Sequence, residues 1–312
     1  MGSDLDIERT IAEALAACGA RSVKQTGARH WRLAFTNGEQ FTAIAVAGED
    51  WLEIEVQSPA ASKRPPRAAR PWECLEWNPG LSGGVKFALA PPDRCPRIRV
   101  ELPLEEGGCQ PEALRMAGLG LKRAVGRLCG KAEAGKPDRA GRAEEKGAAE
   151  AGGSDLEALC ASAGWGFTRR ASGRIAVELE APDCPAQAIV ARRGAGLAAT
   201  VELLSCDALS AKSRHAAALL LLTACGLVRM VRSTAGGADG RTVLGYEVTL
   251  EPSPTDGQLG RGLSALSVAC RLCGPQEVEA MQDEHLAQRY LAVRGWEWPA
   301  AGDTAPVGGP AS

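Results

Sequence analysis

Gly2-Ser3-Asp4-Leu5-Asp6 opens the chain, and Gly153-Ser154-Asp155-Leu156-Glu157 repeats this pattern near the midpoint. Each stretch places a serine three residues before an acidic residue, which is the spacing of a helix capping box. The two halves also end alike, because Arg127-Leu128-Cys129-Gly130 recurs as Arg271-Leu272-Cys273-Gly274, with a glycine suited to a helix C-terminus. These stretches predict a duplicated module with a period of about 145 residues.

Between these landmarks, apolar residues alternate with polar ones in both halves, as they do in half-buried strands. The matching sets are Trp31, Leu33 and Phe35 with Ile175, Val177 and Leu179; Ile44 and Val46 with Ile189 and Ala191; Leu52, Ile54 and Val56 with Leu197, Ala199 and Val201; and Ile98, Val100 and Leu102 with Tyr246, Val248 and Leu250. We therefore expect each module to run helix, three strands, helix, two strands, helix. This is an α+β fold with an antiparallel sheet.

The helices are indicated by capping residues and prolines. The first is expected over 3–18 and 154–163, the second over 71–78 and 210–225, and the third after Pro111 and Pro254. The stretch 216–222 is apolar nearly all round, so this helix must be buried on several sides. A further helix is expected over 275–293, with an apolar stripe of Val278, Met281, His285, Leu286 and Tyr290.

The predicted organisation is a first module over 1–130, a flexible linker over 131–153, a second module over 154–298 and a disordered tail over 299–312. The linker is rich in charged residues, glycine and alanine, and offers little to bury. The tail is rich in proline, glycine and alanine. Trp296 and Trp298, just before it, are expected to dock back onto the second module.

Composition bounds the possible partners. The formal net charge is −2, so no global basic field exists, and neither nucleic acid nor a membrane is an expected partner. No signal peptide opens the chain, and the longest apolar run, 216–228, is too short to span a bilayer. The eleven cysteines are expected to be reduced core thiols. These features predict a cytoplasmic protein.

Three stretches of the first half resemble the type III secretion chaperone-like superfamily, which includes class I secretion chaperones and YbjN-like proteins. They are Leu75-Glu76-Trp77-Asn78, Gly83-Gly84-Val85-Lys86-Phe87-Ala88-Leu89 and Ile98-Arg99-Val100-Glu101-Leu102-Pro103. The resemblance covers about 3–129, and more faintly 154–274. It implies helix–sheet modules that pair through the second helix and the strand region, without catalysis. It also implies a partner polypeptide, often bound as an extended segment.

Secretion chaperones of this class are typically small, acidic, single-module dimers, whereas this chain carries two modules. We therefore expect an intramolecular pseudo-dimer and a monomeric protein, because the linker favours pairing within one chain. The apolar second helices need a cover, and they are the expected interface. Its residues, which are candidates for contact between the modules or with a partner, are Trp72, Leu75 and Trp77 with Leu219, Leu220 and Leu222.

A basic stretch over 63–70 carries Lys63, Arg64, Arg67 and Arg70 in an extended, proline-containing segment. It is either a solvated loop or a contact for an acidic peptide. Cys270 and Cys273 form a CxxC pair at a predicted helix C-terminus, where the helix dipole opposes thiolate formation. They are interpreted as core thiols, with a metal or redox role as the alternative.

No motif indicates a catalytic, cofactor or metal site, since His30, His215 and His285 have no spaced ligand or triad partners. The sequence therefore predicts a non-enzymatic protein- or peptide-binding protein, chaperone-like or adaptor-like. The alternative is a small-molecule-binding protein or an enzyme of another kind, with its site between the two modules. A structural assembly subunit is a third class.

Overall fold

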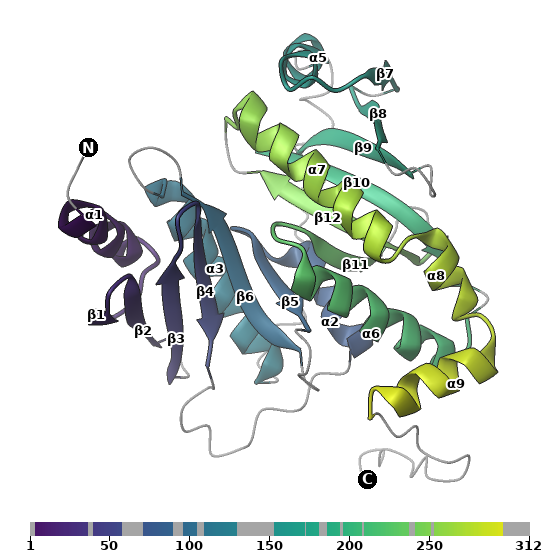
Figure 1. Cartoon of the computed structure of the whole chain (residues 1–312), viewed down its shortest axis with the longest axis horizontal. Coiled ribbons are helices and arrows are strands. Elements are labelled where there is room, and N and C mark those ends of the chain that lie inside the picture. The colour runs from purple at the N-terminus through teal and green to yellow at the C-terminus, as the bar shows by residue number, and fades with distance from the viewer. Residues whose placement is uncertain are drawn as a thin grey trace, which may run out of the picture.

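The computed structural model describes residues 4–36, 40–57, 71–89, 96–104, 109–129, 153–171, 173–180, 186–193, 196–207, 209–236, 241–250 and 253–295. The chain is mixed α+β, as predicted, with two six-stranded sheets. All strand pairs are antiparallel. Figure 1 shows one sheet in each half of the molecule, with the helices α2 and α6 between the halves.

The first module contains three α-helices and six strands in the described residues. In chain order they are α1 (Asp4–Ala16), β1 (Ser22–Gly27), β2 (His30–Thr36), β3 (Gln40–Ala47), β4 (Trp51–Val56), α2 (Pro71–Trp77), the short 3-10 helix η1 (Asn78–Gly80), β5 (Val85–Ala88), β6 (Arg97–Pro103) and α3 (Pro111–Leu128). The strands lie in the order β1-β2-β3-β4-β6-β5.

The second module has the same succession of helices and strands, followed by two further helices. Its elements are α5 (Gly153–Ser162), β7 (Phe167–Arg169), β8 (Ile175–Leu179), β9 (Ala186–Arg193), β10 (Gly196–Ser205), α6 (Ala211–Leu227), β11 (Arg232–Gly236), β12 (Val243–Leu250), α7 (Asp256–Leu272), α8 (Pro275–Ala280) and α9 (Glu284–Val293). The strand order, read from the outer edge, is β7-β8-β9-β10-β12-β11. It matches the order β1-β2-β3-β4-β6-β5 of the first sheet strand by strand.

Each sheet has one more strand than the sequence pattern indicated. Four strands, rather than three, precede the second helix, because β1 and β7 form the outer edges of the two sheets. The side chains of β1 are nearly all exposed and β7 has only three residues, so neither shows an apolar alternation. Periodicity detects half-buried strands and overlooks an edge strand of this kind.

The apolar alternation also gave the wrong buried face for β3 and for its counterpart β9, where Ala188 and Val190 are buried and Ile189 and Ala191 are partly exposed. Ala43, Ala45 and Ala47 are buried, whereas Ile44 and Val46 lie on the opposite face and are partly exposed. In the other strands of the first sheet the expected sets are buried, including Trp31, Leu33 and Phe35. Small alanine side chains fill the core face of β3, and the larger Ile44 and Val46 lie on the open face. The pattern of large apolar residues therefore indicated the wrong face. In Figure 1 this face is turned towards the viewer, and α3 covers the other.

Local capping explains where the helices begin. Pro71 is the first residue of α2, and the Ser210 hydroxyl caps α6 by accepting the Ser213 N–H. Thr255 and Gln258 form a capping box at the start of α7. The predicted single helix over 275–293 is instead two helices, because the chain turns after Ala280 and Asp283 caps α9. As a result Val278, Ala287 and Leu291 are buried, and Leu286 is exposed.

Several predictions fall outside the described residues. They concern the linker over 131–153, of which Gly153 alone is described, the tail over 299–312, and the docking of Trp296 and Trp298. Within the described part of the chain, no helix combines the length and the hydrophobicity needed to cross a membrane.

Candidate functional site

The two modules meet through their second helices. α2 packs against α6 and β11, and α6 also contacts β5. Of the six predicted interface residues, Leu75, Leu219 and Leu222 are fully buried, and Trp72, Trp77 and Leu220 are half-buried. The Arg214 guanidinium of α6 lies 5.7 Å from the Trp72 ring centroid, and the Leu89 N–H donates to the Leu222 carbonyl over 3.0 Å. Trp77 instead packs on Phe87 of its own module.

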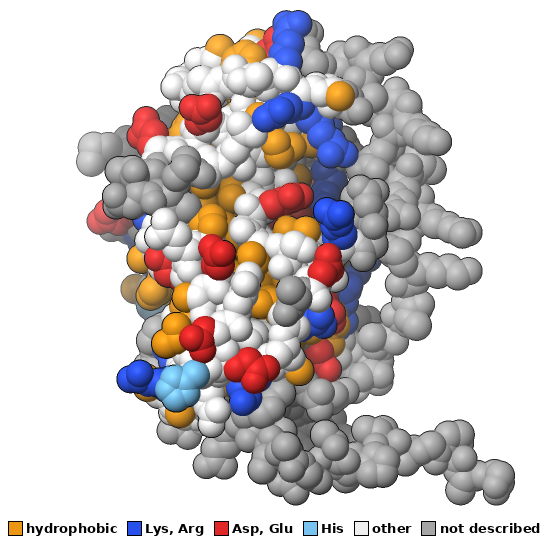
Figure 2. Space-filling model, turned by 90° about the vertical axis from the view of Figure 1, so that its right-hand side faces the viewer, with side chains coloured by type: hydrophobic (Ala, Val, Ile, Leu, Met, Phe, Trp, Pro, Cys, Tyr) orange, Lys and Arg blue, Asp and Glu red, His pale blue; other side chains and the backbone are white. Residues whose placement is uncertain are grey.

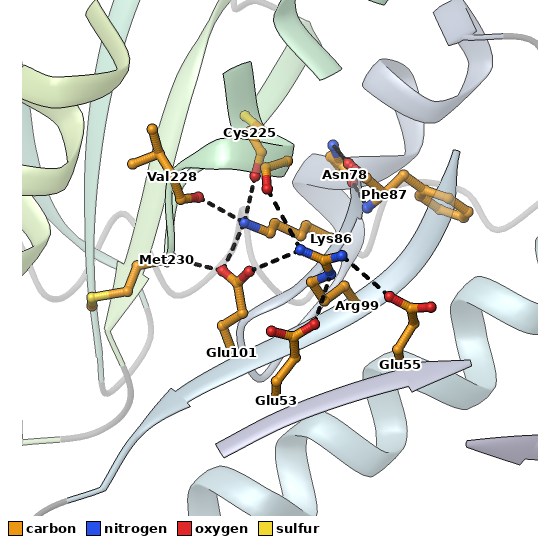
Figure 3. Close-up of polar contacts among 11 residues, drawn as sticks. Glu53, Glu55, Asn78, Lys86, Phe87, Arg99, Glu101, Cys225, Val228 and Met230 are labelled. Atoms are coloured by element: carbon orange, nitrogen blue, oxygen red, sulfur yellow. Dashed lines mark hydrogen bonds and ion pairs between the residues drawn. The ribbon is translucent and has the colours of Figure 1, made fainter. Parts of the chain in front are cut away.

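A group of charged side chains in the first sheet, here called the charge cluster, reaches across this junction. Its members are Glu53, Glu55, Lys86, Arg99 and Glu101 (Figure 3). Lys86 on β5 and Glu101 on β6 are buried, and their Nζ and Oε2 atoms lie 2.7 Å apart. Arg99 lies between Glu53 and Glu55, with nitrogen–oxygen distances of 3.2 Å to each. Buried charges persist only when paired, so these groups must hold one another.

The Lys86–Glu101 pair makes three hydrogen bonds to the backbone of the second module. Lys86 Nζ donates to the carbonyl oxygens of Cys225 and Val228, over 2.7 and 2.8 Å. Glu101 Oε2 accepts the Met230 N–H over 3.0 Å. Residues 226–230, which comprise the last two residues of α6 and the turn after it and are here called the 226–230 turn, are therefore bonded to side chains from the other half of the chain (Figure 3).

Contacts in the opposite direction come from β11. Arg232 forms a buried ion pair with Glu247 and donates from Nη1 to the Leu81 carbonyl of the first module over 2.6 Å. Burial alone would raise the pKa of Glu247, but the guanidinium groups of Arg232 and Arg193 outweigh this effect and hold the pKa below its usual value. The Asn78 side chain of the first module donates back to the Ser233 carbonyl of β11 over 2.7 Å. Each module thus satisfies backbone groups of the other.

An open hollow of about 970 Å³, here called the junction groove, lies beside the 226–230 turn. The first module contributes Trp51 at the start of β4, and the second contributes the remaining residues. They are Ser162, Ala163, Leu227, Val228, Arg229, Met230, Asp256, Gly257, Gly260, Arg261, Ser264, Ala265 and Val268. Leu227 and Val268 are 60% and 44% exposed, so the groove offers large apolar side chains to solvent.

Charged groups stand at the edge of this apolar surface. The Arg229 guanidinium lies 5.3 Å from the Trp51 ring centroid, a cation–π contact that joins the two modules. Arg261 and Asp256 lie on α7, where Asp256 Oδ1 accepts the Gly257 N–H. Trp51 and Arg229 also line a second hollow, of about 350 Å³, together with the acidic residues Glu49, Asp50 and Glu53.

The surface around α8 and α9 has a different character. Figure 2 shows acidic and basic side chains scattered over this side of the molecule, with hydrophobic side chains between them. Interspersed charges of both signs are typical of an ordinary solvated surface. The junction groove is therefore the stronger candidate site.

The cysteines and histidines do not gather at the junction groove. Cys270 and Cys273 are buried, and burial raises the pKa of Cys273 to about 12 and that of Cys225 to about 11. His285 lies at the exposed start of α9. Among the described residues, no three histidine, cysteine or acidic side chains are placed to hold a metal ion. The basic stretch with Lys63, Arg64, Arg67 and Arg70 lies outside the described residues.

The sequence patterns singled out residues of the two second helices, and they did not indicate the polar contacts between the modules. Lys86 is the one charged residue of the apolar strand Val85–Ala88, and this was the available signal; Arg232 begins the polar strand Arg232–Gly236 and gave no comparable signal. Trp51, Arg229 and Val268 are far apart in the sequence, and no local pattern connects them. Comparisons with protein-family models, curated proteins and solved structures gave no match.

Proposed function

We propose that this chain is a non-catalytic binding protein that holds a segment of a partner polypeptide in the junction groove, in the manner of a chaperone or adaptor. One observation carries most of the argument: large apolar side chains, Leu227 and Val268, stay exposed in a hollow to which both modules contribute. Apolar side chains gathered in one exposed area, rather than scattered singly, are typical of surfaces that bind a partner.

The shape of the groove favours a polypeptide over a small molecule. Sites for small ligands have volumes of roughly 300–1,000 Å³ and enclose most of the ligand surface. The junction groove is at the upper end of that range, with about 970 Å³, and is open to solvent. An extended segment can lay its apolar side chains on such a surface and leave its other side in water.

The residues of the groove are suited to holding a chain. Tryptophan and arginine are enriched among the residues that contribute most to binding, and Trp51 and Arg229 stand together at one end. Ala265 and Val268 continue the apolar surface along α7. Among the described residues that line the groove, none is a histidine or a cysteine, and the carboxylate of Asp256 bonds to the backbone of its own helix.

The proposal includes the relationship between the modules. We infer that they arose by duplication and pair as an intramolecular pseudo-dimer of the secretion chaperone-like type. The identical order of strands in the two sheets supports this inference. So does the location of the junction, because α2, α6 and β11 belong to the region through which the resemblance implies pairing. A second copy of the chain is not needed to cover these helices.

Binding to a peptide array tests this function. A peptide selected by the purified full chain should bind the Val268→Asp variant at least about ten-fold more weakly, since a charge replaces an apolar contact. Leu286→Asp on α9 is the matched control, because Leu286 is 43% exposed and Val268 44% exposed, but Leu286 lies outside the groove. Equal losses in both variants, or no selected peptide, would contradict the proposal. A retained small molecule in native mass spectra would favour the alternative function.

A further inference from the structure

The 226–230 turn builds one wall of the junction groove, since Leu227, Val228, Arg229 and Met230 all line it. Its backbone bonds to both modules: the Val228 N–H donates to the Ala224 carbonyl within α6, and side chains of the first module supply the other contacts described here. Lys86 Nζ donates to the Cys225 and Val228 carbonyls, and the Met230 N–H donates to Glu101 (Figure 3). The Arg99 guanidinium is also within 3.5 Å of the Gly226 carbonyl oxygen.

The conformation of this turn requires support. Met230 has a φ of 65°, in the left-handed region that residues other than glycine adopt at a cost. Such residues persist where the surrounding structure determines their conformation. The bond from the Met230 N–H to Glu101 and the contact between Arg229 and Trp51 supply two such constraints, and both come from the first module.

The groups that support the turn are themselves fixed. The side chains of Lys86 and Glu101 are 1% and 4% exposed, so neither can move into solvent without separating a buried pair. Arg99 adds a second positive charge beside Glu101, with 3.7 Å between Nη1 and Oε1. Glu53 and Glu55 hold Arg99 in turn. The charge cluster therefore presents two donors, Lys86 and Arg99, and one acceptor, Glu101, to the turn.

We infer that Lys86 and Glu101 are positioning residues of the junction groove. They hold the turn of the second module in the shape that lines the groove, so the groove forms only while the modules are paired. This inference rests on the proposed function in one respect: if a polypeptide binds there, its binding is linked to pairing. An occupant then stabilises the paired arrangement, and loosening the pairing weakens binding by the same factor.

The test uses the full chain with Lys86→Met and Glu101→Leu combined. Removing both charges leaves neither buried ion unpaired, so the fold is expected to survive. Hydrogen exchange followed by mass spectrometry should show the fragment spanning 226–230 exchanging about ten-fold faster, because its bonds to charged groups are gone. Fragments from β2 and the centre of α7 should keep their protection. Glu112→Gln is the control, because Glu112 is an exposed glutamate of the first module that pairs with Arg115 on its own helix.

Lys86→Met combined with Glu101→Met serves as a second variant, should the first fail to fold, because methionine is closer in length to glutamate than leucine is and neither buried ion is left unpaired. Unchanged exchange at 226–230 in either folded variant would overturn the inference, because the second module would then hold the turn alone. The array-selected peptide should also bind the double variant about ten-fold more weakly. If no peptide binds the unaltered chain, the proposed function fails, and hydrogen exchange still decides whether Lys86 and Glu101 position the turn.

Discussion

Arg232 of the second module donates a hydrogen bond to the carbonyl oxygen of Leu81 in the first module over 2.6 Å. Lys86 makes the reverse contact, from the first module to the Cys225 carbonyl, over 2.7 Å. Each cation is buried, lies on the edge strand nearest the junction, and is ion-paired with a glutamate on the neighbouring strand. The two modules therefore share a reciprocal polar junction as well as an apolar one.

Arg232→Met should lower the free energy of unfolding by about 3 kcal/mol, because it leaves Glu247 buried with Arg193 as its remaining partner. Adding Glu247→Leu should recover most of this loss, since no unpaired buried charge remains. Urea unfolding of the single and double variants measures both values. If the double variant is as unstable as the single one, the loss of stability comes from the missing hydrogen bond to Leu81 and not from the broken ion pair.

The free energy of unfolding should decrease in acid, partly because Glu247 becomes protonated and loses its ion pairs. Its pKa is lowered in the folded state, so its contribution is complete above the unfolded value of about 4.3. That contribution is lost as the pH falls through the lower folded pKa. Glu247→Gln should therefore be less stable than the unaltered chain near neutral pH, and the difference should shrink in acid. Urea unfolding across this pH range checks the trend, and a constant difference would contradict it.

Met230 should tolerate glycine better than valine. Met230→Gly removes the cost of a left-handed conformation at a residue with a side chain, which is about 1 kcal/mol. This gain offsets the entropy that glycine loses on folding. Met230→Val places a branched side chain at the same φ and should be about 2 kcal/mol less stable than the glycine variant. Thermal unfolding compares the two. Equal stability would mean that the turn changes conformation when its side chain changes.

Gly118 is expected to be a sensitive position of the first module. A Cβ atom added there would lie 1.9 Å from the Cys18 carbonyl oxygen, so α3 must move away from the end of α1. Gly118→Ala should cost about 2 kcal/mol or more of stability. Gly126→Ala on the same helix is the control, since nothing lies within 4 Å of its added Cβ. Chemical unfolding distinguishes them, and equal stabilities would argue against close packing of α1 and α3.

The buried cysteines should react slowly with thiol reagents. Burial raises the pKa of Cys18 to about 12 and that of Cys206 to about 11, which leaves almost no thiolate near neutral pH. Cys129 is partly exposed and should react before them. Mass spectrometry after timed alkylation identifies the order. Rapid labelling of Cys270 or Cys273 would contradict this expectation and would favour a redox or metal-binding role for that pair.

The elements that the sequence predicted correctly are those with strong local signals. Ser210, Pro71 and the Thr255–Gln258 pair mark helix starts through bonds that form within one turn. The period-two pattern located β2 and β4, because large apolar residues fill their core faces. It chose the wrong face in β3, where alanines are buried beneath the helices and Ile44 is partly exposed.

The candidate site could not be predicted in the same way, because it depends on contacts between distant parts of the chain. Lys86 within Val85-Lys86-Phe87-Ala88 is expected to face solvent if one sheet is considered alone. It is buried because the second module supplies two carbonyl oxygens to its ammonium group. Trp51 likewise becomes a groove residue only beside Arg229 and α7.

The most direct test of the account is a hydrogen-exchange footprint of the array-selected peptide on the full chain. A polypeptide in the junction groove should protect fragments from both modules together: the start of β4 around Trp51, and the 226–230 turn with residues 256–268 of α7. Protection confined to one module, or found at the outer edge strands β1 or β7, would contradict binding in a groove shared by the two modules.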